Sequence, residues 1–549
     1  MTTIDPVSLV GDAAQSRPAP GPVRTPTETD LSLLLDVGSA WTKAALVGQA
    51  GGRWRIVSGT AQPTTWGESA LVDDLVGRLS PHADTRLSRR LALLVQDAPR
   101  ITCRSARRPG RLAVLADTQA GLDAASRLAT RHGWIIVAGL TAHDRRPEPE
   151  RFEAIRSAEP DAWLAVAGTD AHPAHRPMWG MLAAARRSAG APVLVVGPES
   201  VREPFAALFG STTRWVTATV DEPLGLELLA VLAEVNGVPE VGLLAQPAFS
   251  RSMAALSRGI GLRILGVDLG ATWLAWGDGG GAGVDAILAP GQERSLPQGS
   301  RTATEVLPAD VDEFTMTDAM ANLAANPSAL PSSPAELAIA HAMGIDRLAE
   351  ARQAMGGTPS VDVVVGGGRL LAAAPHPADA ALVLLDGLRP PGVTQLALDP
   401  WGICGPLGTL AGDEVDEGME TLRDDLLVPL GTAVVARGGK PGQLAFRARL
   451  HRSGWPESPR VEVRAGSVAV IPLERGGSGD LELELGKGVQ VGEPHKARRV
   501  RVAVTGGAVG VILDARDDPI QLPARPGDAR TLIQSWRDAL RREGRQVGG

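Results

Sequence analysis

Two short segments of the chain repeat one arrangement, in which an apolar strand meets an acid, a glycine and a threonine before apolar residues resume. The first segment, LLLDVGSAWTKAAL at residues 33–46, contains Asp36, Gly38, Ser39, Thr42 and Lys43. The second segment, LRILGVDLGATWLAWGDGGG at residues 262–281, contains Asp268, Gly270 and Thr272. Turns of this composition expose backbone N–H groups that can approach phosphate oxygens, and an acid at a strand end can bind Mg²⁺.

Each segment by itself has a simpler explanation, because Gly-Ser and similar pairs also form the turns of ordinary β-hairpins. The repetition favours a phosphate site, since an internal repeat indicates two related lobes that face each other. A third segment, VDVVVGGGRLL at residues 361–371, ends a β-branched strand with Gly366, Gly367 and Gly368. Such glycines allow close approach of another backbone or of a flat ligand. We therefore predict a nucleotide cleft with a metal ion on the two strand-end acids.

Together the three segments resemble the actin, hexokinase and Hsp70 superfamily of ATPases. In that superfamily two phosphate hairpins grip the β- and γ-phosphates from opposite lobes, and a Gly-Gly motif lines the adenosine pocket. The resemblance implies ATP or ADP as ligand, with Mg²⁺ held by Asp36 and Asp268. It further implies nucleotide contacts from Gly38, Ser39, Thr42, Lys43, Gly270, Thr272, Gly366, Gly367 and Gly368.

Further segments narrow the resemblance to the glutamate mutase accessory family called MutL or GlmL, which is unrelated to the mismatch-repair protein of that name. The matching segments are GTAQPTT (59–65), PDAWLAVAGTD, GVDLGAT, GGGRLLAAAPHPADAALVLLDGLRPPGVTQLALD and GPLGTLA, in order over residues 31–412. The family implies a chaperone-like or reactivating partner of a cobalamin-dependent mutase. Adenosylcobalamin is then expected on the mutase subunits and not on this chain.

The second hairpin departs from the family pattern, because Trp273 and Leu274 stand where Thr and Asp are expected. Neither side chain can bind Mg²⁺ or orient a water, so we expect ATP to bind more readily than it turns over. Whether the chain is an enzyme stays open, with weak ATPase activity as one possibility and no residue assigned a catalytic role. The alternatives are a non-hydrolysing scaffold that keeps the ATPase fold and a small-molecule kinase.

Residues 111–220 change to regular alternation of apolar strands and helices, which predicts a parallel, doubly wound sheet. Its strands are expected at 112–116, 134–138, 163–167 and 193–196. Gly168, Thr169 and Asp170 follow one of them and could bind a ligand or form an ordinary βα turn. Elsewhere we expect strands at 31–36, 42–48, 53–60 and 91–95 and helices at 67–79, 223–235 and 247–259.

The C-terminal region alternates apolar and polar residues with period two, which predicts a small antiparallel sandwich or barrel followed by an amphipathic helix. It could be a structural appendage or a module that docks a partner. The predicted domains are a disordered arm (1–30), a first ATPase lobe (31–105), an inserted doubly wound α/β domain (106–222), a second ATPase lobe (223–425) and an antiparallel β domain with the terminal helix (426–549). The predicted fold is therefore a two-lobed actin/Hsp70-like α/β ATPase with these additions.

The composition argues against several classes of function. A net charge of −7 over 549 residues gives no sign of a nucleic-acid surface. The two cysteines, Cys103 and Cys404, have no metal-binding spacing and fit a reducing cytoplasm. No apolar run is long enough to span a membrane. Lysine is scarce, with Lys43, Lys440, Lys487 and Lys496 among 55 Lys and Arg residues, so a lysine kept inside the first motif suggests that a compact ammonium is wanted there.

Overall fold

The computed structural model describes much of the chain. The described residues are 2–4, 31–50, 53–79, 85–105, 110–131, 134–168, 177–189, 191–210, 213–217, 243–270, 274–278, 286–288, 311–410, 425–456, 458–492 and 497–547, with a few single residues between them. They divide into two compact units. Unit 1 comprises 1–102, 248–283 and 290–549, and unit 2 comprises 103–247 and 284–289. The predicted domain boundaries stay predictions.

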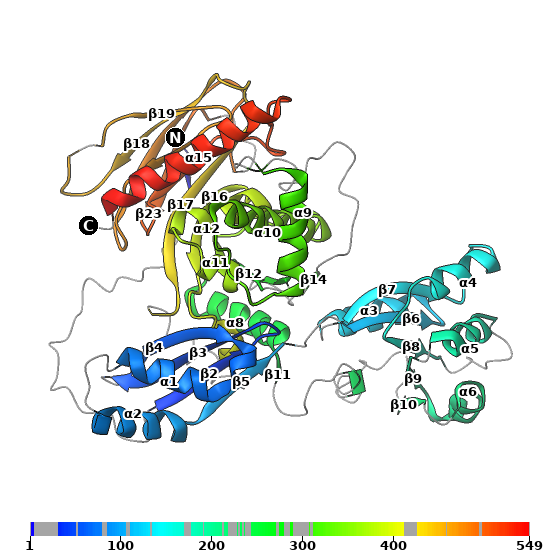
Figure 1. Ribbon diagram of the computed structural model, residues 1–549. Coiled ribbons are helices and arrows are strands. Elements are labelled where there is room, and N and C mark those ends of the chain that lie inside the picture. Colours follow the sequence, from blue (N-terminus) through cyan, green and yellow to red (C-terminus); the bar gives the residue numbers. More distant parts are fainter. Residues whose placement is uncertain are drawn as a thin grey trace. The chain divides into compact units, whose positions relative to one another are not determined.

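The first sheet of unit 1 carries the first acid-glycine hairpin (Figure 1). Its strands, in the order β5-β2-β3-β4, are β2 (Leu31–Val37), β3 (Trp41–Ala50), β4 (Arg53–Pro63) and β5 (Arg100–Arg104). Strands β2, β3 and β4 pair antiparallel, as expected of a hairpin and its extension. The elements that follow β4 are η2 (Thr64–Trp66), α1 (Gly67–Leu79) and α2 (Thr85–Asp97). The strand predictions for 31–60 and the helix prediction for 67–79 are confirmed.

The strand predicted at 91–95 is wrong, because these residues lie within α2. Val95 is buried and Ala92 packs against the same core, whereas Leu93 between them is 59% exposed. A spacing of three residues places Ala92 and Val95 on one face of a helix, so a short apolar run suits either structure. Here the core of the first sheet selects the helix.

The second sheet of unit 1 carries the other two glycine motifs. The strands of this sheet are β12 (Ile264–Leu269), β13 (Leu274–Asp278), β15 (Val363–Gly367), β16 (Gly392–Leu398), β17 (Val428–Arg437), β20 (Val468–Ile471) and β24 (Val511–Asp514). They lie side by side in the order β13-β12-β15-β16-β17-β24-β20. A short strand, β22 (Gln490–Val491), also pairs with β17. The helices between them are α8 (Ala245–Ile260), α9 (Glu313–Ala325), α10 (Pro334–Ala354), α11 (Arg369–Ala372), α12 (Pro377–Leu388) and α13 (Cys404–Leu407). Helix α8 confirms the helix predicted at 247–259.

One apolar core joins the two sheets of unit 1. Leu34 and Ala45 of the first sheet pack with Met253 of α8, Ile264 of β12 and Val363 of β15. Burial of a continuous apolar core gives the two hairpins a common and rigid support. The hairpins are therefore positioned relative to each other by packing and not by a flexible connection.

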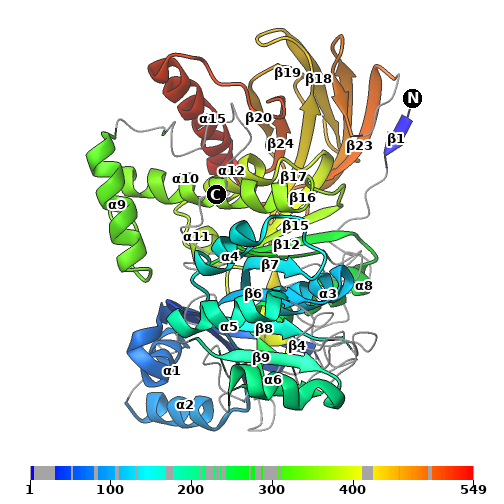
Figure 2. The same ribbon diagram turned by 90° about the vertical axis from the view of Figure 1, so that its right-hand side faces the viewer.

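The C-terminal strands are divided between two sheets (Figure 2). The predicted antiparallel sheet is confirmed for β18 (Leu444–His451), β19 (Val461–Arg464), β21 (Ser478–Leu485) and β23 (Arg499–Thr505). However, β17, β24 and β20 extend the second sheet, and β17 pairs parallel with β24. Apolar side chains of both sheets, such as Val434 and Leu483, fill one core. A purely antiparallel C-terminal fold is therefore wrong, because half of its apolar strands complete the sheet that carries the glycine motifs.

The N-terminal arm predicted for residues 1–30 is wrong at its start. Residues Thr2–Ile4 form β1, which pairs parallel with β23, with Thr2 opposite Val500. The remainder of the arm, 5–30, lies outside the described residues, as does most of the helix predicted at 223–235. A sheet edge offers unpaired N–H and C=O groups, which explains how so short a segment joins β23.

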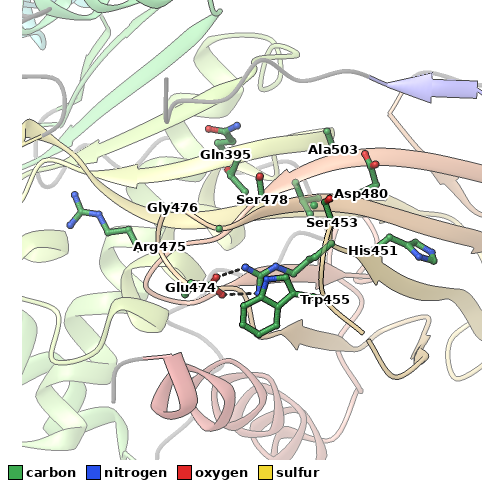
Figure 3. Close-up of a pocket in the computed structure, with 15 residues that line it drawn as sticks. Gln395, His451, Ser453, Trp455, Glu474, Arg475, Gly476, Ser478, Asp480 and Ala503 are labelled. Carbon is green, nitrogen blue, oxygen red and sulfur yellow. Dashed lines mark hydrogen bonds and ion pairs between the residues drawn. The ribbon is translucent and has the colours of Figure 1, made fainter. Parts of the chain in front are cut away.

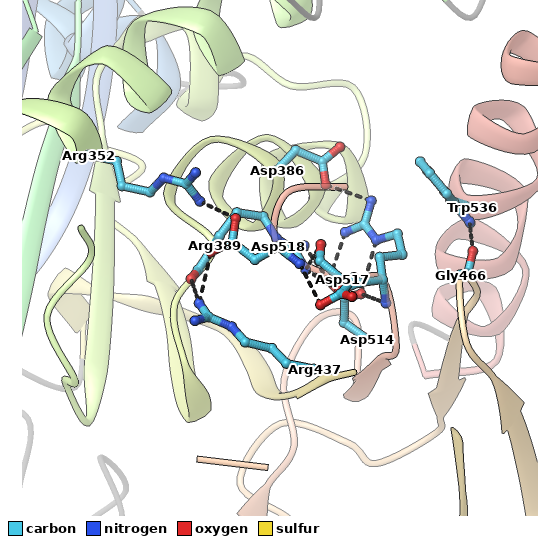
Figure 4. Close-up of polar contacts among 10 residues, drawn as sticks. Arg352, Asp386, Arg389, Arg437, Gly466, Asp514, Asp517, Asp518 and Trp536 are labelled. Atoms are coloured by element: carbon cyan, nitrogen blue, oxygen red, sulfur yellow. Dashed lines mark hydrogen bonds and ion pairs between the residues drawn. The ribbon is translucent and has the colours of Figure 1, made fainter. Parts of the chain in front are cut away.

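The last helix is fastened to unit 1 by polar contacts. Helix α15 (Pro526–Val547) packs on β20 and α12 (Figure 2). Arg541 donates to both oxygens of the buried Asp379 at 2.8–3.1 Å. Figure 4 shows that Trp536 Nε1 donates to the Gly466 carbonyl, at 2.9 Å. The amphipathic helix predicted at this end of the chain is thus confirmed, and its partner is the chain's own second sheet.

His341, buried on α10 beneath α15, should make stability depend on pH. Burial and the nearby Arg537 and Arg541 together lower its pKa to about 4, with Asp379 opposing them in part. Because the pKa in the unfolded chain is about 6.5, the unfolded state binds more protons between pH 6.5 and 4, and stability falls as the pH drops through that window. We expect urea unfolding to show an extra loss of at most about 1.4 kcal/mol per pH unit there, absent in His341→Gln. Identical pH slopes for the two proteins would contradict this assignment.

Unit 2 contains a single parallel sheet in the order β10-β9-β8-β6-β7. Its strands are β6 (Gly110–Ala116), β7 (Trp134–Thr141), β8 (Ala162–Val166), β9 (Val193–Gly197) and β10 (Arg214–Thr217). The other elements are α3 (Gln119–Arg131), α4 (Glu148–Arg156), α5 (Pro177–Ala189), η4 (Glu199–Val201), α6 (Arg202–Phe209), β11 (Leu243–Leu244) and β14 (Ala286–Leu288). Separate apolar cores cover the two faces. The predicted parallel sheet is confirmed.

The helices within the described ranges include none that is long and apolar enough to cross a membrane.

Candidate functional site

The first hairpin brings a lysine and an acid into direct contact. Strands β2 and β3 pair with Asp36 opposite Lys43, so the two side chains leave neighbouring strands at the same level. Lys43 Nζ donates to Asp36 Oδ2 at 2.6 Å, and both side chains are about one-tenth exposed or less, at 11% and 7%. Antiparallel register therefore makes this buried ion pair from residues of a single hairpin.

The second hairpin adds an acid to the same cluster. Asp268 lies at the end of β12, one residue before the strand finishes, and its Oδ1 is 4.0 Å from Lys43 Nζ. Among the described residues this Oδ1 has no hydrogen-bond partner, although it is buried. The acids predicted from the two hairpins thus both lie within 4.0 Å of one ammonium, all within unit 1.

The triple glycine lies beside Asp268 because β15 is the parallel neighbour of β12, with Gly367 opposite Asp268. A Cβ on Gly368, where φ is +90°, would lie 2.2 Å from the Leu269 carbonyl oxygen, and one on Gly366 would press on Leu371 at 2.9 Å. Close backbone approach, one of the two roles offered by the sequence, therefore accounts for Gly368, whereas Gly366 makes room for leucine side chains. The adenosine contact of Gly366, Gly367 and Gly368 stays a prediction.

The remaining residues of the first motif shape its turn. The Gly38 amide donates to the Trp41 carbonyl at 3.0 Å, and a Cβ on Gly38 would lie 2.5 Å from that oxygen. Thr42 Oγ1 donates to Thr64 Oγ1 at 3.1 Å, and Thr64 in turn donates to the Gly38 carbonyl at 2.9 Å. Ser39 also lies in this turn.

The second motif is described in part. Gly270 directly follows β12, whereas Thr272 and Trp273 lie outside the described residues. In unit 2, the Gly168 amide donates to Asp117 Oδ2 at 2.9 Å, which is the contact of an ordinary strand-end turn. Thr169 and Asp170 also lie outside the described residues.

Two contributors to the cluster were not predicted from the sequence. Asp399, after β16, accepts hydrogen bonds from the amides of Gly402 at 2.8 Å and Cys404 at 2.9 Å. Gly402, with φ +65°, borders the Lys43 side chain so closely that a Cβ would lie 2.1 Å from Lys43 Cδ. The signal available in the sequence was an acid at a strand end before a Pro and a Gly, in LDPWG, which resembles any turn.

A second cation borders the first hairpin. Arg369 begins α11 directly after Gly368, and its guanidinium carbon lies 4.3 Å from the centre of the Trp41 ring. Burial lowers the pKa of Arg369 below its ordinary value. Stacking on an indole holds the guanidinium in place while leaving its edge able to donate hydrogen bonds.

The cluster is electrostatically coupled. Burial by itself lowers the pKa of Lys43, but Asp268, Asp36 and Asp399 outweigh it and raise that pKa above its ordinary value. Burial raises the pKa of Asp268, opposed by Lys43 and reinforced by Asp36 and Asp399. The lysine thus stays charged and compensates carboxylates that would otherwise repel one another.

The donor set fits Mg²⁺ poorly. Mg²⁺ requires oxygen ligands in near-octahedral order, whereas the space between Asp36 and Asp268 already holds an ammonium. Across the described ranges, no group of three or more His, Cys, Asp or Glu side chains is arranged to hold a metal ion. We therefore derive no step through a metal at this site.

A pocket of about 690 Å³ lies elsewhere in unit 1, over the C-terminal sheet (Figure 3). The Arg452 guanidinium lies 4.6 Å from the ring centre of Trp455, which is 63% exposed, and pairs with Glu474. A glycine-rich turn at 476–479 closes one side. None of the residues predicted from the sequence as nucleotide ligands lines this pocket, so it is separate from the Lys43 cluster.

The comparison with protein families matches residues 32–221 to the family described as MutL protein. Residues 32–221 are therefore similar to the MutL family. The matched segment is less than half of the chain, and it contains the first hairpin and the parallel sheet of unit 2. The resemblance stated from sequence motifs is confirmed over this segment. Among the curated proteins, none matches this chain.

Solved structures similar to this chain include three distant ones. Nucleotide-free acetone carboxylase is 11% identical over 79% of this chain and 81% of its own, with a TM-score of 0.32. The PilM–PilN type IV pilus biogenesis complex is 13% identical over 73% and 98%, with a TM-score of 0.24. Xylulose kinase from Bifidobacterium adolescentis is 11% identical over 72% and 94%, with a TM-score of 0.24. TM-scores this low do not establish a shared fold.

Proposed function

We propose that this chain, whose residues 32–221 are similar to the MutL family, is a nucleotide-binding accessory protein, chaperone-like or reactivating, for an adenosylcobalamin-dependent mutase of the glutamate mutase type. The observation that carries the proposal is the meeting of the two acid-glycine hairpins at Lys43, beside the triple glycine. Unit 1 then serves as an actin/Hsp70-like nucleotide unit of two lobes, with unit 2 as the inserted domain. Adenosylcobalamin belongs to the mutase subunits and not to this chain.

The chemistry of the cluster suits a phosphate group more than any other small ligand. Lys43 supplies a fixed positive charge, and Arg369 supplies a guanidinium that can bind two phosphate oxygens at once. Asp268, next to the last residue of β12, lies at the same cluster. Binding energy gained at both hairpins would favour one arrangement of the lobes over others, which is how a nucleotide could act on a partner protein.

The proposal predicts that ADP and ATP bind to unit 1 with Asp36 as a required residue. Asp36→Ala removes the counter-charge that positions Lys43, and we expect at least about a tenfold loss of affinity, equal to about 1.4 kcal/mol. Isothermal titration calorimetry measures this directly. Asp117→Ala is the matched control, since Asp117 is also a buried acid at the end of a strand but lies in unit 2. Undiminished binding by Asp36→Ala would remove the basis of the assignment.

The partner half of the proposal has a separate test. Tagged chain should retain purified cobalamin-dependent mutase subunits, and the retained amount should differ between ADP and ATP. Nucleotide binding without any retention of mutase would leave the non-hydrolysing scaffold or the small-molecule kinase as the function. A kinase would in addition need a carboxylate placed to act as a general base.

A further inference from the structure

The acids predicted to hold a metal ion already share a cation that belongs to the chain. Lys43 Nζ lies 2.6 Å from Asp36 and 4.0 Å from Asp268, so one ammonium is close to carboxylates of both hairpins. We propose that Lys43 permanently fills the cation position of this site, and that the site binds its nucleotide without a divalent metal ion. This inference rests on the proposed nucleotide site.

The position of the Lys43 side chain is fixed by contacts with several parts of the fold. Its place opposite Asp36 is fixed by the β2–β3 register, and its alkyl chain lies against Gly402, where even a Cβ would clash at 2.1 Å. The turn that presents Gly402 is in turn fixed by the Asp399 carboxylate, which accepts the Gly402 amide at 2.8 Å. A side chain confined at its base, stem and charged end has little freedom to leave for an incoming ion.

Binding of a divalent ion at this position would cost free energy, because the ion would have to displace the Lys43 ammonium. To reach Asp36 it would displace the ammonium from its closest partner, and the buried Lys43 would then face a cation in place of a carboxylate. The ammonium needs no such exchange, because it donates to Asp36 and lies within reach of the unpartnered Asp268 Oδ1. The scarcity of lysine in this arginine-rich chain agrees with a specific need for a compact ammonium here.

The nucleotide can still meet positive charge without a metal. An ammonium has three donors, and Asp36 engages one of them at 2.6 Å. Arg369 is held on the Trp41 ring at the border of the same hairpin. A phosphate group bridging Lys43 and Arg369 would receive from the chain the charge compensation that Mg²⁺ supplies to bound nucleotides elsewhere.

The first arm of the test measures metal binding with Mn²⁺ as the probe, by electron paramagnetic resonance of free Mn²⁺ in solutions of the full chain. Wild type should bind no Mn²⁺ that depends on Asp36. Lys43→Met keeps the alkyl packing and removes the charge, so it should gain a Mn²⁺ site, whereas Lys440→Met, at an exposed lysine, should gain none. Adding Asp268→Asn to Lys43→Met should weaken the new site at least about tenfold.

Two results in this arm would overturn the inference. One is Mn²⁺ binding by wild type that Asp36→Asn abolishes. The other is a Lys43→Met protein with native circular dichroism that gains no Mn²⁺ site. The wild-type measurement stands even where Lys43→Met fails to fold.

The second arm measures ADP and ATP binding calorimetrically in EDTA and in Mg²⁺. Equal affinities support metal-independent binding, and binding seen only with Mg²⁺ overturns it while leaving the proposed function intact. Binding in neither buffer would refute the proposed function, and the Mn²⁺ arm alone would then decide whether Lys43 fills the cation position.

Discussion

Replacement of Arg516 by methionine is expected to lower the free energy of unfolding by about 3–5 kcal/mol. Arg516 is fully buried and pairs with Asp514 at 2.9 Å and with Asp386 at 2.6 Å. Arg389, also buried, contacts Asp514 at 2.8 Å (Figure 4). Removing one cation leaves two buried carboxylates with too little compensating charge, which costs far more than an apolar substitution on the surface.

The electrostatics of the network agree with this expectation. Burial by itself raises the pKa of Asp514, but Arg389 and Arg516 outweigh it and bring the pKa well below its ordinary value. Burial keeps the pKa of Asp386 raised despite Arg516 and Arg389. Asp514 therefore depends on its arginines for its charge in the folded chain.

Urea unfolding of Arg516→Met and of Arg447→Met measures the effect with a matched control. Arg447 also pairs with an acid, Glu462 at 2.8 Å, but the two side chains are 40% and 51% exposed. Exposed pairs contribute about 0–1 kcal/mol, so Arg447→Met should change little. Equal losses in the two variants would show that burial of the Arg516 network contributes nothing beyond an ordinary surface pair.

Turnover of ATP by the chain alone is expected to be slow, well below the roughly 10 s⁻¹ of a typical enzyme. Leu274, which begins β13, is fully buried and pairs with Leu269, so it offers no polar group to a water or a phosphate. Trp273 before it has no carboxylate or hydroxyl either. Losing one preorganised transition-state donor costs about 10²–10³ in rate, whereas binding can persist through other donors.

Phosphate release by the purified chain, measured against nucleotide binding under the same conditions, tests this prediction. Asp36→Ala serves as a check for contaminating ATPase, since a rate that stays unchanged while nucleotide affinity falls does not come from the hairpin site. A rate near 10 s⁻¹ that Asp36→Ala abolishes would show that the apolar residues after the second hairpin are harmless. Acceleration by mutase subunits would indicate that the partner supplies the missing group.

The sequence by itself determined the features that depend on neighbours along the chain. The parallel sheet of unit 2 follows from continuous apolar strands alternating with helices, and the structure has all four predicted strands in parallel register. The β2–β3 hairpin likewise follows from a short turn between apolar strands, and its register alone places Lys43 against Asp36. Local pattern is sufficient there because the paired residues are separated by a few positions.

Only the tertiary structure decided where distant segments meet. The run at 91–95 suits a strand or a helix until the core selects the face with Ala92 and Val95, and apolar strands such as β24 suit either C-terminal sheet until β17 pairs with them. The same holds for the candidate site. The packing of β12, β15 and β16 brings Asp268, Asp399 and Gly402 to Lys43. The residues next to Lys43 in the sequence do not predict these contacts. A buried charge is compensated by whatever the fold brings to it, so the partners of Lys43 are a property of the packed chain and not of the motif.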